Sequence, residues 1–167
     1  MIISTTDLTH VYRLGSSSIV AVNKVNLQIE EATFVSFIGP SGSGKTTLLN
    51  LIGLNDQPTS GKIFFKDKDT SLLTGRARRK IRLQNIGFVF QSYHLIDELT
   101  VYENLETPLL YQKVKPDERK GRVAETLDRF NIVAKKDLFP NQLAGGQQQL
   151  VAIARAVIAN PKLILAD

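Results

Sequence analysis

The residues best suited to chemistry in this sequence form one eight-residue stretch, Gly39-Pro40-Ser41-Gly42-Ser43-Gly44-Lys45-Thr46. Its glycines let backbone N–H groups curl around an anion, and the lysine would reach the β- and γ-phosphates of a nucleotide. The Thr46 hydroxyl would sit on Mg²⁺ between the same phosphates. The stretch is a phosphate-binding P-loop, or Walker A motif. It predicts nucleotide binding over the alternative of a plain Gly/Ser-rich turn, because every position matches.

Such a loop needs a strand that aims it and a helix whose N-terminus supplies partial positive charge. The apolar run Phe34–Ile38 precedes the loop and predicts the strand. The run Thr47–Ile52 follows it and predicts the helix. The loop therefore stands in the strand-to-helix context that phosphate binding requires.

Length and composition limit the alternatives. A chain of 167 residues, 43% hydrophobic and 22% charged, is expected to be a single globular domain spanning 1–167. No apolar run approaches the roughly 20 residues of a membrane span, and the N-terminus does not resemble a secretory signal, so a cytoplasmic location is expected. With no cysteine and two histidines, a disulfide framework or a zinc site is not expected.

The net charge of +5 does not by itself indicate nucleic acid binding. Much of the excess lies in one basic run, and no aromatic residues that would stack on bases are interleaved with it. The run is predicted to be a solvated helix face, and no nucleic acid partner is expected; it consists of Arg76, Arg78, Arg79, Lys80 and Arg82.

The first half of the chain predicts mainly strands. Residues 2–12 are β-like, and Val25, Leu27 and Ile29 alternate with polar residues, which is typical of a half-buried antiparallel strand. Tyr12 is then either an ordinary strand-end aromatic or a ring that stacks on adenine.

Two further strands are expected after the P-loop helix, over residues 62–66 and 86–90. Gln91 follows the second, where its amide could reach Mg²⁺ or the attacking water, or could be a plain surface residue.

The second half predicts helices. Thr100 and Glu103 fit a capping box, so a helix should run from there toward Tyr111, kinked or interrupted at Pro108. Pro116 should open another helix, in which Val123, Leu127 and Phe130 form an apolar stripe.

The last two elements belong to the predicted nucleotide site. An apolar helix is expected within 143–160, starting at a pair of glycines, and a buried strand over 163–167 ends in Asp167. A carboxylate at that position in a P-loop protein is the expected second anchor of Mg²⁺.

These elements predict an α/β fold, with a P-loop NTPase core of mostly parallel sheet, an N-terminal antiparallel β layer and a helical subdomain, incomplete at the C-terminus. The expected segments are the β layer and P-loop core over 1–91, the helical subdomain over 92–142, and the last helix and strand over 143–167.

Four motifs together resemble the ATP-binding subunit of ABC transporters over essentially the whole chain: GPSGSGKTT at 39–47, FVFQ at 88–91, LAGGQQQLVAIARA at 143–156 and LILAD at 163–167. The glycine pair within a Gln-rich helix start is similar to the family signature. The amino-acid sequence around these motifs is similar to that of the lipoprotein-release and macrolide-export branch of the family.

The resemblance implies ATP and Mg²⁺ as cofactors. It implies that Tyr12 stacks on adenine and that Gln91 senses Mg²⁺ and a membrane permease. It assigns the residues of the site as follows: a catalytic set of Lys45, Gln91 and Asp167; metal ligands from Thr46, Gln91 and Asp167; and nucleotide contacts from Tyr12, Gly39, Pro40, Ser41, Gly42, Ser43, Gly44, Lys45, Thr46, Thr47, Ala144, Gly145, Gly146 and Gln147.

The resemblance also implies partners. A second ATP-binding subunit, identical or different, would close its signature segment over the γ-phosphate held by Lys45. The pair would be peripheral on the inner face of the cell membrane, attached through the permease, where it would power export or lipoprotein release.

The sequence departs from the family pattern at Ala144, where the signature serine is usual, and at Leu150, where a basic residue is usual. It also ends at Asp167, before the family's catalytic glutamate and switch histidine. The expectation is therefore a truncated member that binds ATP and hydrolyses it poorly.

Two alternatives stay open. One is a non-hydrolytic fragment that binds nucleotide and pairs with intact subunits. The other, a chromosome-maintenance ATPase head, would require a coiled-coil insertion, and no sustained heptads are seen.

Overall fold

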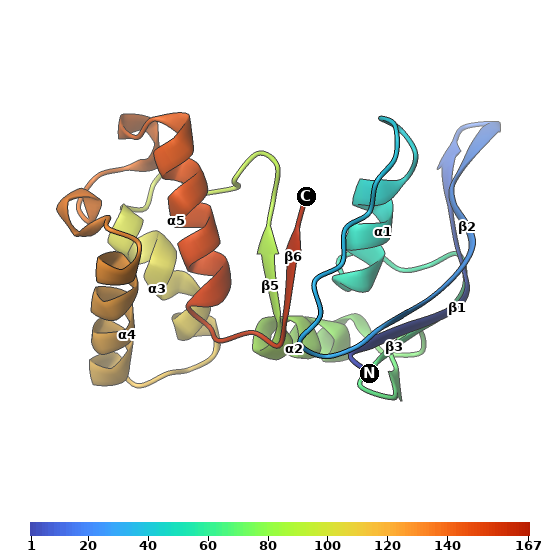
Figure 1. Cartoon of the computed structure of the whole chain (residues 1–167), viewed down its shortest axis with the longest axis horizontal. Helices are drawn as coiled ribbons and strands as arrows, with labels where there is room; N and C mark the ends of the chain where they lie inside the picture. The colour runs from blue at the N-terminus through green and yellow to red at the C-terminus, as the bar shows by residue number, and fades with distance from the viewer. The chain divides into compact units, whose positions relative to one another are not determined.

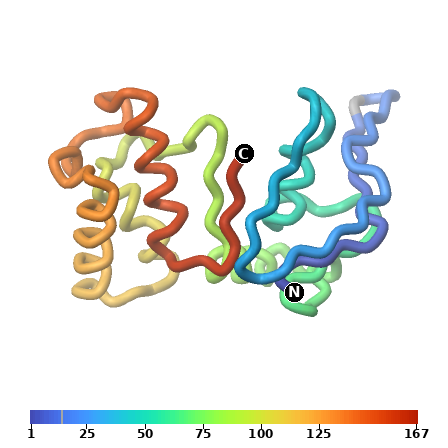
Figure 2. Tube along the Cα trace, in the orientation of Figure 1, coloured from blue at the N-terminus to red at the C-terminus, as the bar shows by residue number. Residues whose placement is uncertain are grey.

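The computed structural model describes residues 1–167 apart from the side chain of Leu14. The chain divides into two compact units, Met1–Lys80 and Ile81–Asp167 (Figure 1). Figure 2 follows the trace from the N-terminus, where β1 begins, to the C-terminus at the end of β6. The single-domain organisation with boundaries at 91 and 142 stays a prediction.

The first unit contains a four-stranded antiparallel sheet in the order β2-β1-β3-β4. Its strands are β1 (Ile3–Leu14), β2 (Ser17–Ile29), β3 (Ser60–Phe65) and β4 (Lys68–Asp69). Ile3 pairs with Ile29 on one side and with Phe65 on the other, and Ile3 is fully buried. The sheet confirms the predicted antiparallel β layer.

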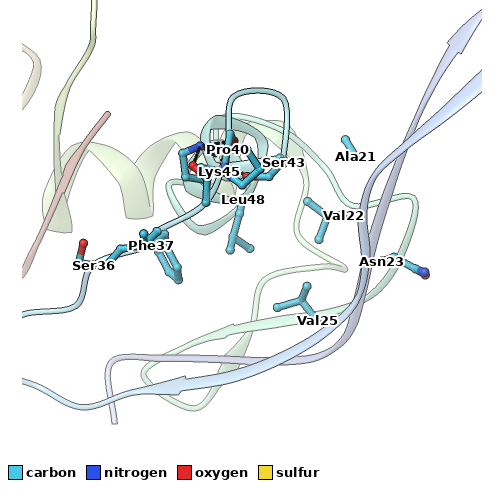
Figure 3. Close-up of a pocket in the computed structure, with 13 residues that line it drawn as sticks. Ala21, Val22, Asn23, Val25, Ser36, Phe37, Pro40, Ser43, Lys45 and Leu48 are labelled. Carbon is cyan, nitrogen blue, oxygen red and sulfur yellow. Dashed lines mark hydrogen bonds between the residues drawn. The ribbon is translucent and has the colours of Figure 1, made fainter.

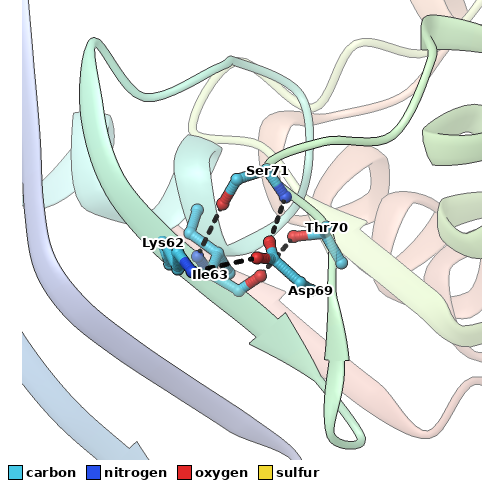
Figure 4. Close-up of polar contacts among 5 residues, drawn as sticks. All are labelled: Lys62, Ile63, Asp69, Thr70 and Ser71. Carbon is cyan, nitrogen blue, oxygen red and sulfur yellow. Dashed lines mark hydrogen bonds and ion pairs between the residues drawn. The ribbon is translucent and has the colours of Figure 1, made fainter.

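A polar network closes the β3–β4 edge of this sheet (Figure 4). The Ile63 N–H donates to the Ser71 hydroxyl at 3.0 Å, and the Ile63 carbonyl accepts from the buried Thr70 hydroxyl at 2.7 Å. Asp69 accepts from the Ser71 N–H at 2.9 Å and lies 3.8 Å from the Lys62 ammonium. Side chains thus satisfy backbone groups of Ile63 where the short strand ends, which protects an exposed sheet edge.

The predicted strand at Phe34–Ile38 is absent: the described backbone has neither strand nor helix over residues 30–44. A β-strand is held by hydrogen bonds to a neighbour, and no such neighbour pairs with this segment within its unit. Phe34 and Ile38 are consequently 97% and 95% exposed. An apolar run favours a strand, but the run alone does not supply the neighbouring strand that pairing requires.

Helix α1 (Lys45–Ile52) follows the P-loop as predicted. It buries Leu49, Leu51 and Ile52. Helix α2 (Gly75–Asn85) carries the basic run, contains the boundary between the two units, and has no fully buried residue. Arg76, Arg79 and Lys80 are exposed on it, as predicted for a solvated basic face. Arg78 and Arg82 are partly buried, and Arg78 donates to the Asp56 carbonyl at 3.3 Å, so the prediction holds for three of the five residues.

The second unit contains a parallel pair of strands, β5 (Ile86–Val89) and β6 (Leu163–Ala166). Helix α5 (Gly145–Val157) packs on β5 through a close approach at Gly87. A Cβ added to Gly87 would lie 2.3 Å from the Ala156 carbonyl oxygen. Only glycine fits there, because a helix backbone occupies the space that a side chain would need.

Helices α3 (Val101–Tyr111) and α4 (Pro116–Arg129) pack with α5 around a common apolar core. Two short 3₁₀ turns, η1 (Val133–Lys135) and η2 (Pro140–Gln142), connect α4 to α5. The core includes Leu105, Val123, Leu127 and Val151. This group confirms the predicted apolar stripe of α4.

The predicted helix starts are confirmed at Thr100 and Pro116. Thr100 and Glu103 form a complete capping box at the start of α3, and Pro116 occupies the first turn of α4. Of the predicted kink or interruption at Pro108, the interruption was wrong, because α3 continues through it to Tyr111, and the kink stays a prediction. Pro108 stands in the last turn, so only a few intrahelical hydrogen bonds follow the one it removes.

Candidate nucleotide-binding site

The Lys45 side chain lies over the P-loop that precedes it. Its Nζ donates to the carbonyl oxygens of Gly39 at 2.9 Å and Pro40 at 2.8 Å, and lies 3.5 Å from the Ser43 hydroxyl. The loop thus curls around one cation at the start of α1. Weak neutral acceptors hold that cation, and an anionic group would compete well for it, because charge-assisted pairs are stronger than bonds to carbonyls.

Two glycines give the loop its curvature. Gly42 and Gly44 have φ values of 79° and 88°, in the left-handed region that other residues rarely adopt. A Cβ on Gly44 would also lie 2.1 Å from the Ala21 carbonyl oxygen. A side chain at Gly44 is therefore excluded twice, once by backbone conformation and once by the β2 backbone.

The N-terminus of α1 suits an anion. Gly44 is the N-cap residue and provides no side-chain hydrogen bond, and the first turn contains no acidic residue. The first N–H groups of a helix have no intrahelical acceptor and carry partial positive charge. Together with the Lys45 ammonium they form a positive, donor-rich surface, and the residues present fit the phosphates of a nucleotide.

Tyr12 lies beside this surface, within the same unit. Its hydroxyl oxygen is 3.3 Å from that of Thr47, which is buried in the first turn of α1. The His10 ring contacts it edge-on, with ring centroids 4.7 Å apart at 81°. Tyr12 is nevertheless 40% exposed. A fixed, partly exposed ring next to a phosphate loop can stack on a base.

A cavity of about 570 Å³ adjoins the P-loop (Figure 3). Lys45, Pro40 and Ser43 of the loop line it together with Val22 and Leu48. Away from the loop the walls are mainly apolar, so they suit nonpolar atoms better than phosphate oxygens. The candidate surface for an anion is therefore the loop itself and not the interior of the cavity.

Gln91 is exposed in the second unit, just beyond Phe90 and strand β5. The Phe88 and Phe90 rings stack at 4.2 Å, and the Phe90 ring contacts the His94 ring at 4.6 Å. These contacts hold residues on either side of Gln91, which is itself exposed. Its assignment as a Mg²⁺ or water ligand stays a prediction.

The signature segment forms the start of α5. Ala144 is the N-cap residue, and its N–H donates to the Gln147 side-chain oxygen at 3.1 Å. This is half of a capping box, since alanine has no oxygen for the reciprocal bond. Gly145 and Gly146 are exposed at the first turn. The segment therefore presents helix N–H groups to solvent, as nucleotide binding from a second subunit would require.

Asp167 follows β6 and is exposed. Its N–H donates to the Val89 carbonyl at 3.1 Å, so the parallel pairing of β5 and β6 continues to this residue. Oxygen atoms of Thr46, Gln91 and Asp167 are of the kind that Mg²⁺ prefers. Within the described residues no group of three or more His, Asp or Glu forms a ready metal site.

Sequence reasoning missed two residues that organise the second unit. Gln148 donates to the carbonyls of Pro140 at 3.0 Å and Leu143 at 3.1 Å, which holds the loop before the signature segment. Arg155 donates to the carbonyls of Tyr93 and His94. Burial lowers the pKa of the Arg155 guanidinium, which nevertheless stays charged. A lone arginine in the apolar run VAIARAV was the available signal.

None of the helices of the described chain has the length and apolar character needed to cross a bilayer.

Comparisons with known proteins identify the family. The family described as ABC transporter matches residues 22–167. An uncharacterized ABC transporter ATP-binding protein of Thermotoga maritima is 44% identical over 161 residues, covering 96% of this chain and 69% of that protein. The macrolide export ATP-binding/permease protein MacB of Sodalis glossinidius is 40% identical over 156 residues, 93% of this chain and 24% of that protein.

A solved structure is similar over the whole chain. The ATP-binding cassette MJ0796, in a dimeric post-hydrolysis state bound to ADP and Pi, aligns with a TM-score of 0.94 and 44% identity, covering 99% of this chain and 73% of that one. MJ0796 comes from Methanocaldococcus jannaschii. The chain belongs to the ABC transporter ATP-binding family, and the predicted fold class is confirmed.

Proposed function

We propose that this chain is a cassette that binds Mg·ATP, pairs with a second ATP-binding subunit and drives a membrane permease. The observation that carries the proposal is the Lys45 ammonium, which lies 2.8 to 2.9 Å from two P-loop carbonyls at the N-terminus of α1. A cation held by weak neutral acceptors is poised to transfer its hydrogen bonds to phosphate oxygens.

Different residues of this chain would contact different parts of the nucleotide. Tyr12 would stack on the base, and the loop from Gly39 to Ser43 would surround the phosphates with N–H groups. Lys45 would reach the β- and γ-phosphates, with Thr47 beside it. Bound Mg²⁺ would neutralise phosphate charge, and Thr46, Gln91 and Asp167 would supply its oxygen ligands.

A second subunit would complete the site. The exposed start of α5, from Ala144 to Gln147, offers helix N–H groups to the terminal phosphate of a nucleotide held by a partner chain. The dimeric state of MJ0796 supports this arrangement. Each nucleotide would then join two cassettes.

The permease and the process are inferred from relatives. MacB combines an ATP-binding part and a permease in one protein, and its name describes macrolide export. We propose by analogy that this chain serves an export or lipoprotein-release system and lies at the inner face of the cell membrane. Residues 1–91, 92–142 and 143–167 would act as one ABC-type domain.

Calorimetric titration with Mg·ATP tests the proposal. The parent should bind, and Lys45→Ala should give no signal, because the main side-chain contact is lost. Lys120→Ala is the matched control, since Lys120 is exposed on α4 in the other unit. Equal affinity in parent and Lys45→Ala would refute the proposed role of the P-loop.

Ala144 favours a second candidate, a subunit that binds nucleotide and pairs without efficient turnover. The missing hydroxyl removes a donor to the phosphate, and hydrogen bonds to charged groups contribute about 1.5 to 3 kcal/mol. Phosphate release would separate the two candidates. A rate well above that of Lys45→Ala would support the ATPase, and an equal rate would support the non-hydrolytic subunit.

A further inference from the structure

Arg155 joins helix α5 to the turn that follows Gln91. Its Nη1 donates to the His94 carbonyl at 2.7 Å, and its Nη2 donates to the Tyr93 carbonyl at 2.9 Å. The guanidinium is half-buried, so solvent competes only in part for these bonds. Two charge-assisted bonds from one planar group fix both the position and the orientation of the carbonyls.

The turn at Tyr93 and His94 is strained. Both residues have left-handed backbones, with φ values of 61° and 46°. Consecutive residues with side chains rarely adopt this conformation, and it persists only where the surroundings enforce it. Arg155 binds the carbonyls of these same two residues. Two hydrogen bonds within the turn also stabilise it. The Tyr93 N–H donates to the Phe90 carbonyl at 2.9 Å, and the His94 N–H donates to the Ser92 carbonyl at 2.6 Å.

The same turn touches the signature segment. A Cβ added to Gly145 would lie 3.6 Å from the Tyr93 hydroxyl oxygen, so the Tyr93 side chain reaches the first residue of α5. Tyr93 therefore contacts α5 at its start through its side chain and further along through its carbonyl. The turn and the helix are connected at two separate points.

We propose that Arg155 is a positioning residue that holds the strained turn after Gln91 against the helix that begins with the signature segment. Gln91 lies two residues before Tyr93, so the direction of its amide depends on this turn. The purpose assigned to Arg155 rests on the proposed function, whereas the restraint itself is a property of the second unit alone.

Amide hydrogen exchange of the full chain tests the restraint. In Arg155→Ala the Tyr93 and His94 amides should exchange about ten- to hundredfold faster than in the parent, the range for losing hydrogen bonds to a charged group. Amides of the α3–α4 core should change much less. Arg122→Ala is the matched control, because the Arg122 guanidinium pairs with Glu118 on an exposed face at 2.7 Å. Equal exchange in parent and Arg155→Ala would overturn the proposal.

A second substitution separates restraint from general damage. Glycine adopts the left-handed backbone without steric cost, so His94→Gly added to Arg155→Ala should slow Tyr93 exchange back toward the parent value. Failure of this rescue would overturn the claim that Arg155 offsets strain. If Arg155→Ala does not fold, Arg155→Lys should show faster Tyr93 exchange than Arg122→Lys, and equal exchange would overturn the proposal.

Nucleotide titration keeps this test apart from the proposed function. Arg155→Ala should bind Mg²⁺-free ATP like the parent, since the P-loop lies in the other unit and Gln91 is proposed as a ligand of Mg²⁺ alone. If the parent does not bind ATP, the proposed function is refuted, but the hydrogen-exchange result still supports the restraint by Arg155. Faster exchange together with unchanged ATP affinity is the outcome expected of a positioning residue.

Discussion

The hydroxyl oxygens of Tyr12 and Thr47 lie 3.3 Å apart, which joins the end of strand β1 to the first turn of the P-loop helix. The contact places an aromatic ring beside the predicted phosphate site. Tyr12→Ala should weaken ATP binding by about 1 to 3 kcal/mol, the range for loss of base stacking on an aromatic ring. Calorimetric titration measures it.

Tyr12→Phe is the control, because it removes the hydroxyl contact and keeps the ring. Its ATP affinity should stay close to that of the parent. If Tyr12→Ala is folded and binds ATP as tightly as the parent, the ring is a packing residue and has no role in stacking.

The incomplete cap of α5 predicts a stabilising substitution. Ala144 already has the extended backbone of an N-cap, with φ −65° and ψ 154°, and lacks only the oxygen. Ala144→Ser should raise the free energy of unfolding by about 1 kcal/mol, the typical value of a serine cap. Urea denaturation followed by circular dichroism measures the change. Ala124→Ser, inside α4, is the control and should not stabilise; equal effects would exclude capping as the cause.

Glu103 predicts a pH dependence of stability. Hydrogen bonds from the Thr100 backbone N–H at 2.8 Å and from its hydroxyl at 2.9 Å lower the pKa of the Glu103 carboxyl below its usual 4.5. A lowered carboxyl pKa stabilises the folded state above the unfolded pKa, and this stabilisation is lost as pH falls through the folded pKa. The stability advantage of the parent over Glu103→Gln should therefore be greatest near neutral pH and shrink in acid.

Unfolding by urea at several pH values measures that advantage. Glu125→Gln, which removes an exposed carboxylate from the body of α4, is the control for charge loss. An advantage over Glu103→Gln that stays constant from neutral pH into acid would contradict the assigned role of the carboxylate.

Asn104 is the buried polar residue with the most partners in the second unit. It is fully buried, accepts from the Ile96 N–H at 2.9 Å, and donates to the carbonyls of Ile96, Leu99 and Thr100 at 3.0 Å each. Asn104→Leu should cost at least about 2 kcal/mol of stability, because each buried group left unpaired costs about 1 to 3 kcal/mol. Chemical denaturation measures it, with Asn141→Leu at an exposed position as the control. Similar losses in both variants would argue against a structural role for the Asn104 network.

Local signals predicted much of the fold. The spacing of the P-loop, the Thr100 and Glu103 pair and the position of Pro116 each act within a few residues, and each predicted its element correctly. The strand expected at Phe34–Ile38 is not formed, because a strand depends on a pairing partner that is distant in the sequence, and no local signal reports that partner.

In the candidate site, too, local patterns could be predicted and contacts between residues distant in the sequence could not. Lys45 is a predicted site residue because the chemistry of phosphate binding dictates the local pattern of the P-loop. Gln91 is a predicted site residue because it follows a buried strand and because of the family resemblance. Arg155 was missed because its acceptor at His94 is 61 residues away, and no periodicity records that distance. The Asn104 network was missed for a related reason, because an asparagine inside a helix pattern looks like any exposed polar residue.

Gly87 has a consequence for the interpretation of mutational scans. The Ala156 carbonyl oxygen occupies its side-chain position, so every substitution at Gly87 should be rejected as severely as one at Gly44, although Gly87 has no part in the proposed ATP contacts. In a saturation library selected for function, the two glycines would be indistinguishable by tolerance alone. Intolerance in this protein therefore marks close backbone approach as readily as it marks a binding site, and only a ligand-binding measurement on folded variants tells the two apart.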